Sequence, residues 1–217
     1  MTLVIAVDGT AASGKGTLAK KLARHFGFAH LDSGSLYRLV ALGVIDEGGS
    51  PNNEADALKA AQAVDPSRAD DPRIRTGEIG SAASLVSVFP GVRATLLDYQ
   101  RRFAAMPPGA VIDGRDIGTV VCPDAPAKLF VDAAPEVRAR RRFLELAARG
   151  DNPDEAAILK DIQERDARDR SRPIAPLKPA PDAALLDTTH LDIDAAFKAA
   201  LDLVKPKIEG LVARPRG

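Results

Sequence analysis

The sequence predicts an α/β protein in which helices flank a parallel sheet. Short apolar runs occur at residues 3–7, 110–112, 128–131 and 184–186, with a weaker fifth run at 28–31. Such runs, bounded by polar residues, are typical of strands that are buried on both faces. Helical patterns separate the runs, and this alternation indicates βαβ units, whose ligands bind at the carboxyl ends of the strands.

The helices are predicted from apolar residues at helical spacing. Leu18, Leu22 and Phe26 recur every four residues after the first run. Further helical patterns cover roughly residues 92–103, 136–148, 154–170 and 194–212. The polar stretches 50–56 and 65–73 are predicted to be loops that leave the sheet, because Pro, Asn, Asp and Ser crowd them.

Composition narrows the class of protein. The chain has 217 residues, 45% of them hydrophobic, which is enough for one domain with a sizeable core. Its 30 basic and 30 acidic residues balance, which argues against a general binder of nucleic acid or of anionic membranes. The single cysteine, Cys122, is expected to pack in the core, and no apolar run is long enough to span a bilayer. We therefore expect a cytoplasmic protein.

The string "DGTAASGKGT" follows the first apolar run and matches a phosphate-binding loop. Gly9, Gly14 and Lys15 have the spacing G-x-x-x-x-G-K, although Gly16 stands where Ser or Thr is usual and Thr17 comes one place later. A glycine-rich turn between a strand and a helix directs backbone N–H groups at phosphate oxygens, and the helix dipole adds positive charge. We expect Lys15 to reach the outer phosphates and Thr17 to contact phosphate or magnesium-bound water.

Charged residues also follow the second and third predicted strands. The string "LDSGSLYR" opens a helix that carries Arg38, and "VIDGRDIGT" places Asp113, Arg115 and Asp116 at the same edge of the sheet. Asp side chains often stabilise turns and helix starts. That role does not explain an Arg between two Asp residues, so a second ligand site is predicted here. Asp113, at the end of a strand, also suits magnesium-bound water.

A third group of charges lies in "ERDARDRSR". On a helix Arg165, Asp169 and Arg172 would share one face. Alternating charges, like the run "VRARRR" at 137–142, are usually solvated helix surface. Beside a phosphate-binding loop, however, these arginines are candidates to bind phosphate and to neutralise a phosphoryl group in transfer.

The chain resembles the bacterial-type cytidylate kinases. The strings that carry the resemblance are "DGTAASGKGT", "LDSGSLYR", "AAS" with "FPGVR", "DGRDIGTVV", "PDAP", "RARRR" and "ERDARDR" with "APL". It implies a three-layer sandwich of the P-loop NTPase type with a five-stranded parallel sheet. It also implies one domain over residues 1–217, with mobile segments: a nucleoside-monophosphate lobe at about 33–107 and a short lid at about 144–154. The implied reaction converts ATP plus CMP or dCMP to ADP plus CDP or dCDP, with Mg²⁺. We expect a monomer, because one chain would suffice for this mechanism.

The resemblance also implies a role for each site residue. The ATP phosphates would be held by Gly9, Thr10, Ala11, Ala12, Ser13, Gly14, Lys15, Gly16 and Thr17. The CMP phosphate or the transferred group would meet Ser33, Arg38, Arg165 and Arg172, and the sugar Asp169. The cytosine pocket would be formed by Ser84, Arg93, Arg115 and Asp116, beside Asp113. ATP would be clamped by Arg138, Arg141 and Arg142, which complete a catalytic set with Lys15, Arg165 and Arg172. Thr17 and Asp113 are the candidates to hold Mg²⁺ through water.

Two departures from the family pattern concern the loop and an insert. Thr10, Ala11 and Ala12 stand where the family often has Pro and a middle Gly, so the sequence predicts a negative φ at the alanines. The β insert that precedes the "AAS" string in longer members shrinks to about residues 65–79.

Two alternative functions remain open at this point. One is a kinase of the same fold that acts on another monophosphate or on a metabolite hydroxyl. A hydroxyl acceptor would need a general base and fewer arginines. The other is a nucleotide switch or slow ATPase, which would not need a second anion site. The three histidines, at 25, 30 and 190, are expected to have ordinary surface or packing roles.

Overall fold

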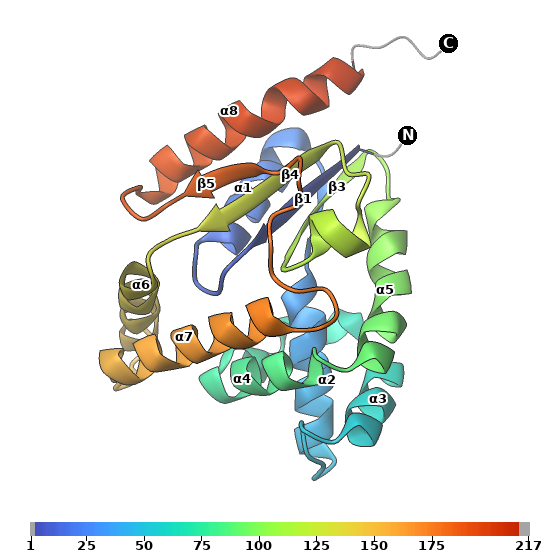
Figure 1. Ribbon diagram of the computed structural model, residues 1–217, viewed down its shortest axis with the longest axis vertical. Helices are drawn as coiled ribbons and strands as arrows, with labels where there is room; N and C mark the ends of the chain where they lie inside the picture. The colour runs from blue at the N-terminus through green and yellow to red at the C-terminus, as the bar shows by residue number, and fades with distance from the viewer. Residues whose placement is uncertain (1–2, 213–217) are drawn as a thin grey trace.

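Five parallel strands form the central sheet of the computed structural model, which describes residues 3–212 (Figure 1). In order across the sheet they are β2 (Ala29–Asp32), β3 (Gly109–Gly114), β1 (Leu3–Gly9), β4 (Ala127–Asp132) and β5 (Ala184–Asp187). Each of the five predicted runs is a strand, and the predicted α/β class with a parallel sheet is confirmed.

The register brings the polar strand ends to one level. Asp113 on β3 lies beside Val7 on β1 and Asp32 on β2, while Asp132 on β4 lies beside Asp187 on β5. Parallel strands end at the same edge of a sheet, so the loops that follow them share that edge.

Helices cover both faces of the sheet. On one face α1 (Lys15–Phe26) and α8 (Ile193–Val212) pack on Ile5, Val7 and Leu129. On the other face the end of α5 (Pro90–Ala104) and a π-turn, η3 (Ile117–Val121), pack on Val4, Ala6 and Ile112. Successive residues of β1 thus serve opposite cores, as strand geometry requires.

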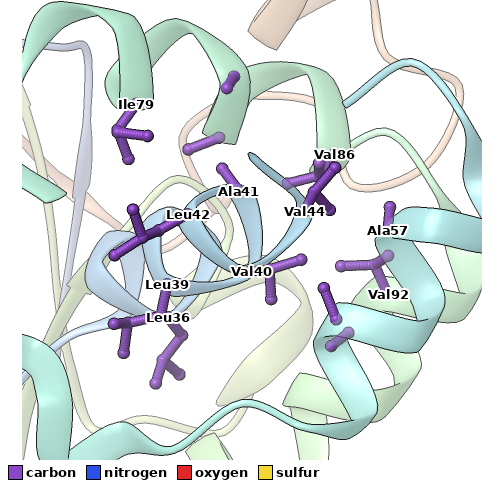
Figure 2. Packing of buried hydrophobic residues seen from close by; sticks show 14 of the residues in the cluster. Leu36, Leu39, Val40, Ala41, Leu42, Val44, Ala57, Ile79, Val86 and Val92 are labelled. Carbon is purple, nitrogen blue, oxygen red and sulfur yellow. The ribbon is translucent and has the colours of Figure 1, made fainter. Parts of the chain in front are cut away.

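A helical lobe has a core of its own, below the sheet in Figure 1. It contains α2 (Ser33–Asp46), α3 (Glu54–Gln62), α4 (Gly77–Val86) and α5. Leu36, Val40 and Val44 of α2 belong to this core, and Figure 2 shows Val44 close to Val86 and Val40 facing Val92 of the neighbouring helices. This lobe coincides with the segment predicted to bind the monophosphate.

Two further helices, α6 (Pro135–Ala147) and α7 (Glu155–Ser171), pack against each other, and α7 also packs against α4 of the lobe. The predicted lid, 144–154, is the end of α6 and the connection to α7. Among residues 3–212 no single helix is long and apolar enough to cross a membrane. The pair α4 and α5 meets the length and composition criteria together, but it is bent by 103°.

The prediction of loops at 50–56 and 65–73 is wrong in part. Helix α3 already begins at Glu54, because the side chain of Asn53 accepts hydrogen bonds from the N–H groups of Ala55 and Asp56. The second stretch forms two 3₁₀ turns, η1 (Pro66–Asp70) and η2 (Pro72–Arg75), which are capped by Asp65 and Asp71. Capped 3₁₀ turns, rather than irregular loop, therefore make up most of residues 65–75.

Candidate active site

A cleft of about 1370 Å³ opens at the carboxyl edge of the sheet, between the glycine-rich loop, the helical lobe and the α6–α7 pair. Every site residue predicted from the sequence lines this cleft except Gly9, Thr10 and Arg138. The structure therefore brings together groups of residues that are far apart in the chain, such as the loop at 11–17 and Arg165, Asp169 and Arg172.

The loop between β1 and α1 depends on close backbone packing. A Cβ at Gly9 would lie only 2.0 Å from the carbonyl oxygen of Val131, so no larger residue fits there. Gly14, with φ of 88°, caps α1 in the left-handed region. The predicted negative φ is wrong for Ala12, which has φ of 58°.

Three side chains donate hydrogen bonds to carbonyl groups of the loop. Lys15 Nζ donates to the carbonyl of Thr10 at 3.2 Å, and Thr188 Oγ1 donates to that of Ser13 at 3.0 Å. Arg138 Nη1 donates to the carbonyl of Ala11 at 3.2 Å. Within residues 3–212 the N–H groups of residues 12–17 donate to no other protein group. A row of free amides at a helix start is the arrangement that binds phosphate.

Lys15 extends beneath the loop toward the strand ends. Desolvation, with a contribution from nearby Arg115, lowers the pKa of Lys15 from 10.5 to about 7. Asp113 faces the first turn of α1, since its Oδ2 would lie 3.6 Å from a Cβ at Gly16. Burial raises the pKa of Asp113, while His30, whose Nε2 lies 2.9 Å from Oδ1, opposes that rise. This end of the cleft therefore offers Lys15 to an anion and Asp113 to the cation that accompanies it.

Arginines crowd the opposite side of the cleft. Arg115 Nε donates to Asp169 Oδ2 at 2.9 Å. A Cβ at Gly80 would lie 3.3 Å from Arg38 Nη1 and 3.6 Å from Arg165 Nη1, so these two guanidinium groups converge on α4. Arg165 Nε is buried and has no partner among the described residues. Desolvation and the charge of Arg115 lower the pKa of Arg165 to about 10.

The inner end of the cleft combines a carboxylate with an arginine and an aromatic ring. Asp116 pairs with Arg93, whose guanidinium group lies 5.7 Å from the ring centre of Tyr37. Arg172 donates to Ser87 Oγ at 3.2 Å, and its Nε is buried without a partner among residues 3–212. The prediction that Arg172 lies on a helix face is wrong, because α7 ends at Ser171. Arg172 is the first residue after α7, and its side chain reaches the cleft from that position. Ser33 and Ser84 line the same wall.

The three arginines of α6 differ in their surroundings. Arg141 lines the cleft and donates to the carbonyl of Thr188 at 2.6 Å. Arg142 spans from α6 to the lobe, where it donates to the carbonyl of Arg75 at 3.1 Å. Arg138 is only 1% exposed and pairs with Asp166 behind the loop, so it does not face the cleft.

Sequence reasoning gave no role to two residues at this edge. Asp8 accepts hydrogen bonds from the N–H groups of Ile117 and Gly118, both at 2.8 Å, and so holds the turn after Asp116. The sequence feature that could have pointed to Asp8 is a carboxylate at the end of an otherwise apolar strand. His30, expected to have an ordinary role, instead lines the cleft beside Asp113. Cys122, as expected, packs against the core, and burial raises its pKa to about 11.

The chain is similar to known proteins over most of its length. A family model described as cytidylate kinase matches residues 5–206. The chain is 58% identical over 203 residues to a cytidylate kinase of Rhodopseudomonas palustris (strain TIE-1), which covers 94% of this chain and 96% of that relative. A cytidylate kinase of Bradyrhizobium diazoefficiens is 56% identical over the same length, with the same coverage of 94% and 96%.

Solved structures support the fold. A gluconokinase from Sinorhizobium meliloti 1021 aligns with a TM-score of 0.51 at 14% identity, over 97% of this chain and 95% of that one. A sugar kinase from Janibacter sp. HTCC2649 aligns with a TM-score of 0.50 at 17% identity, over 99% of each chain. The predicted P-loop architecture is confirmed, and the chain belongs to the cytidylate kinase family, whose members are phosphotransferases.

Proposed function

We propose that this enzyme transfers the γ-phosphoryl group of ATP to CMP and dCMP. The observation that carries the proposal is a cleft with two separate anion sites. At one end are loop amides, and at the other buried guanidinium nitrogens, that have no partner among residues 3–212. A buried arginine nitrogen without a partner calls for an anionic ligand. Two phosphorylated substrates that face each other satisfy both ends.

The base-binding end favours cytosine. Its exocyclic amine is a donor that the Asp116 carboxylate accepts, and its ring nitrogen and carbonyl accept from Arg93 and Ser84. Uracil carries a carbonyl in place of the amine, so it would set an acceptor against Asp116. An unpaired buried polar group of this kind gives strong discrimination.

The chemistry requires alignment and charge neutralisation more than covalent help. A phosphate oxygen of CMP, already ionised at neutral pH, attacks the γ-phosphorus in line with the departing ADP oxygen. Lys15 and the arginines at 141, 142, 165 and 172 stabilise the charge of the transition state, while Arg38 and Ser33 orient the acceptor phosphate. Arg115 fixes Asp169 toward the sugar.

A magnesium ion fits the residues beside the loop. Within residues 3–212 no three acidic, His or Cys side chains gather to hold a metal by themselves. Mg²⁺ usually takes one or two protein ligands together with phosphates and water. Thr17 and Asp113 suit that arrangement, and the ion would neutralise charge on the nucleotide phosphates.

Water is a competing acceptor, so the proposal includes closure of the lobe at 33–107 and of the lid at 144–154 over both nucleotides. Arg142 already links α6 to the lobe through Arg75. The cleft of one chain contains all the groups named here, so a monomer suffices for the reaction. We place the reaction in the cytoplasm, with no nucleic acid or membrane partner.

The test is the initial rate of ADP formation with CMP, dCMP, UMP, AMP or GMP as acceptor, at fixed ATP and Mg²⁺. Fast turnover with CMP and dCMP only is the expected result. Preference for AMP or GMP would refute the cytosine pocket and favour a kinase for another monophosphate. Equal ATP hydrolysis in every reaction would favour an ATPase or switch.

A further inference from the structure

We propose that Arg138 and Asp166 form a positioning pair that keeps the phosphate-binding loop in its ATP-binding conformation. The inference deepens the proposed function and rests on it for the identity of the nucleotide. Arg138 Nη2 lies 2.7 Å from Asp166 Oδ2, and the two side chains are 1% and 5% exposed. This buried pair joins α6 to α7, the helix that carries Arg165 and Asp169.

Two other donors of Arg138 bind backbone carbonyls, one within the loop and one after β4. Its Nε donates to Ala133 at 2.7 Å, just after β4, and its Nη1 donates to Ala11 at 3.2 Å. The planar guanidinium group thus spans three fixed acceptors, a geometry that the single ammonium group of lysine does not reproduce. Asp166 fixes the orientation of that plane.

The contact with Ala11 controls the strained residue of the loop. The carbonyl of Ala11 and the N–H of Ala12 belong to one rigid peptide plane, and they point in opposite directions. Holding the carbonyl outward therefore turns the Ala12 N–H the other way and sets the φ of Ala12 at 58°. Residues with a Cβ disfavour this region, whereas glycine adopts it freely. An alanine here makes the loop dependent on the arginine behind it.

The experiment separates positioning from simple stability. A buried ion pair can often be replaced by apolar residues without loss of stability, whereas removal of one partner is strongly destabilising. We therefore test two variants. One is the double variant Arg138→Met/Asp166→Leu (the Met–Leu chain) and the other is Arg138→Lys, and each is also made with Ala12→Gly added. The readouts are the melting temperature, the Kd of a non-hydrolysable ATP analogue by calorimetry, and KM for ATP and CMP.

In the Met–Leu chain we expect the melting temperature to fall less than in Arg138→Met alone, because no buried charge is left unpaired, although the carbonyls of Ala11 and Ala133 lose a donor. We expect its Kd and KM for ATP to rise about tenfold, the effect of one lost hydrogen bond from a charged donor, with KM for CMP unchanged within about twofold. Arg138→Lys, which keeps the charge beside Asp166, should weaken ATP binding similarly. Ala12→Gly should restore most of the affinity in both chains.

The matched control is Arg140→Gln, because Arg140 and Glu155 form an exposed α6–α7 ion pair, 2.9 Å apart, that does not touch the loop. It should leave every readout unchanged. Unaltered ATP affinity in folded Arg138 variants, or no rescue by Ala12→Gly, would overturn the inference. If the Met–Leu chain does not fold, the Arg138→Lys pair of variants decides. A wild type that binds ATP but does not phosphorylate CMP would refute the proposed function alone.

Discussion

Asp116 is the residue on which the proposed choice of base depends. It is 5% exposed, and its partner Arg93 also donates to the carbonyl of Ser87 at 3.2 Å. The side chain is thus held in one orientation, and a carboxylate held this way accepts from an amine but repels a carbonyl. The preference for cytosine therefore depends on one hydrogen-bond acceptor, the Asp116 carboxylate, held in a fixed position.

We predict that Asp116→Asn narrows the preference for CMP over UMP. The amide can donate to the uracil carbonyl, while the charged acceptor for cytosine is lost. One charged hydrogen bond corresponds to about 1.5–3 kcal/mol, so kcat/KM for CMP should fall about 10- to 100-fold. The value for UMP should change much less. The measurement is the ratio of the two kcat/KM values, with the exposed carboxylate variant Asp182→Asn as a control. An unchanged ratio would contradict the assignment.

Lys15 makes ATP binding dependent on pH. Its pKa, lowered to about 7 by desolvation, means that the free enzyme carries a largely neutral Lys15 at pH 8. Bound phosphates favour the charged form and raise the pKa again, so binding takes up a proton. Affinity for ATP should therefore fall as pH rises above 7, by up to about tenfold per unit, and should not depend on this group below 7.

Calorimetry in buffers of different ionisation enthalpy measures that proton uptake directly. At pH 8 we expect nearly one proton per ATP in the wild type and none from this source in Lys15→Met. Equal uptake in both proteins would show that another group titrates.

At the scale of elements, the end of β1 organises two loops at once. Asp8 holds the turn of η3 through two backbone N–H groups, and the next residue, Gly9, begins the phosphate-binding loop. Burial raises the pKa of Asp8 to about 7, although those two N–H groups favour its charged form. The ATP-binding loop and the turn beside the cytosine pocket are therefore both anchored at Asp8.

Asp8→Asn should lower stability by about 2 kcal/mol. The amide would present an N–H to a backbone N–H, leaving one buried donor unpaired. For a chain of this size the melting temperature should fall by roughly 4–8 °C. Thermal unfolding measures the effect, and Asp124→Asn, an exposed carboxylate in the following turn, should be neutral. A melting temperature equal to that of the wild type would show that the two hydrogen bonds contribute little.

Strands and most helices could be predicted from the sequence because their signals are local. Apolar runs and four-residue spacing depend only on residues that are neighbours along the chain. The place of the cleft could be predicted as well, because ligands bind where parallel strands end. The positive φ of Ala12 and the burial of Arg138 were not predictable in this way. Each depends on contacts with α6, α7 and the end of β4, which come together only in the folded chain. The start of α3 was missed because one Asn side chain outweighed a loop-like composition.

At the scale of the whole molecule, the sheet and the helical lobe have separate cores, and the cleft lies between them. Separate cores allow one part to move without disturbing the packing of the other. Two nucleotides that bind across the cleft would draw these parts together.

We predict that CMP and a non-hydrolysable ATP analogue together slow amide hydrogen exchange at 33–107 and 144–154 more than either nucleotide does alone. Closure needs contacts from both nucleotides, and it protects the backbone of the segments that close. Exchange measured by mass spectrometry in the free, singly bound and doubly bound enzyme tests this. Protection that is merely the sum of the two single effects would argue against closure.

The most direct test of the account is the ratio of CDP formed to ATP consumed, measured by chromatography with and without CMP. Transfer between two phosphates in a closed cleft predicts one CDP per ATP, and almost no ADP when CMP is absent. ADP that forms equally in both reactions, without CDP, would contradict the transfer of phosphate to CMP.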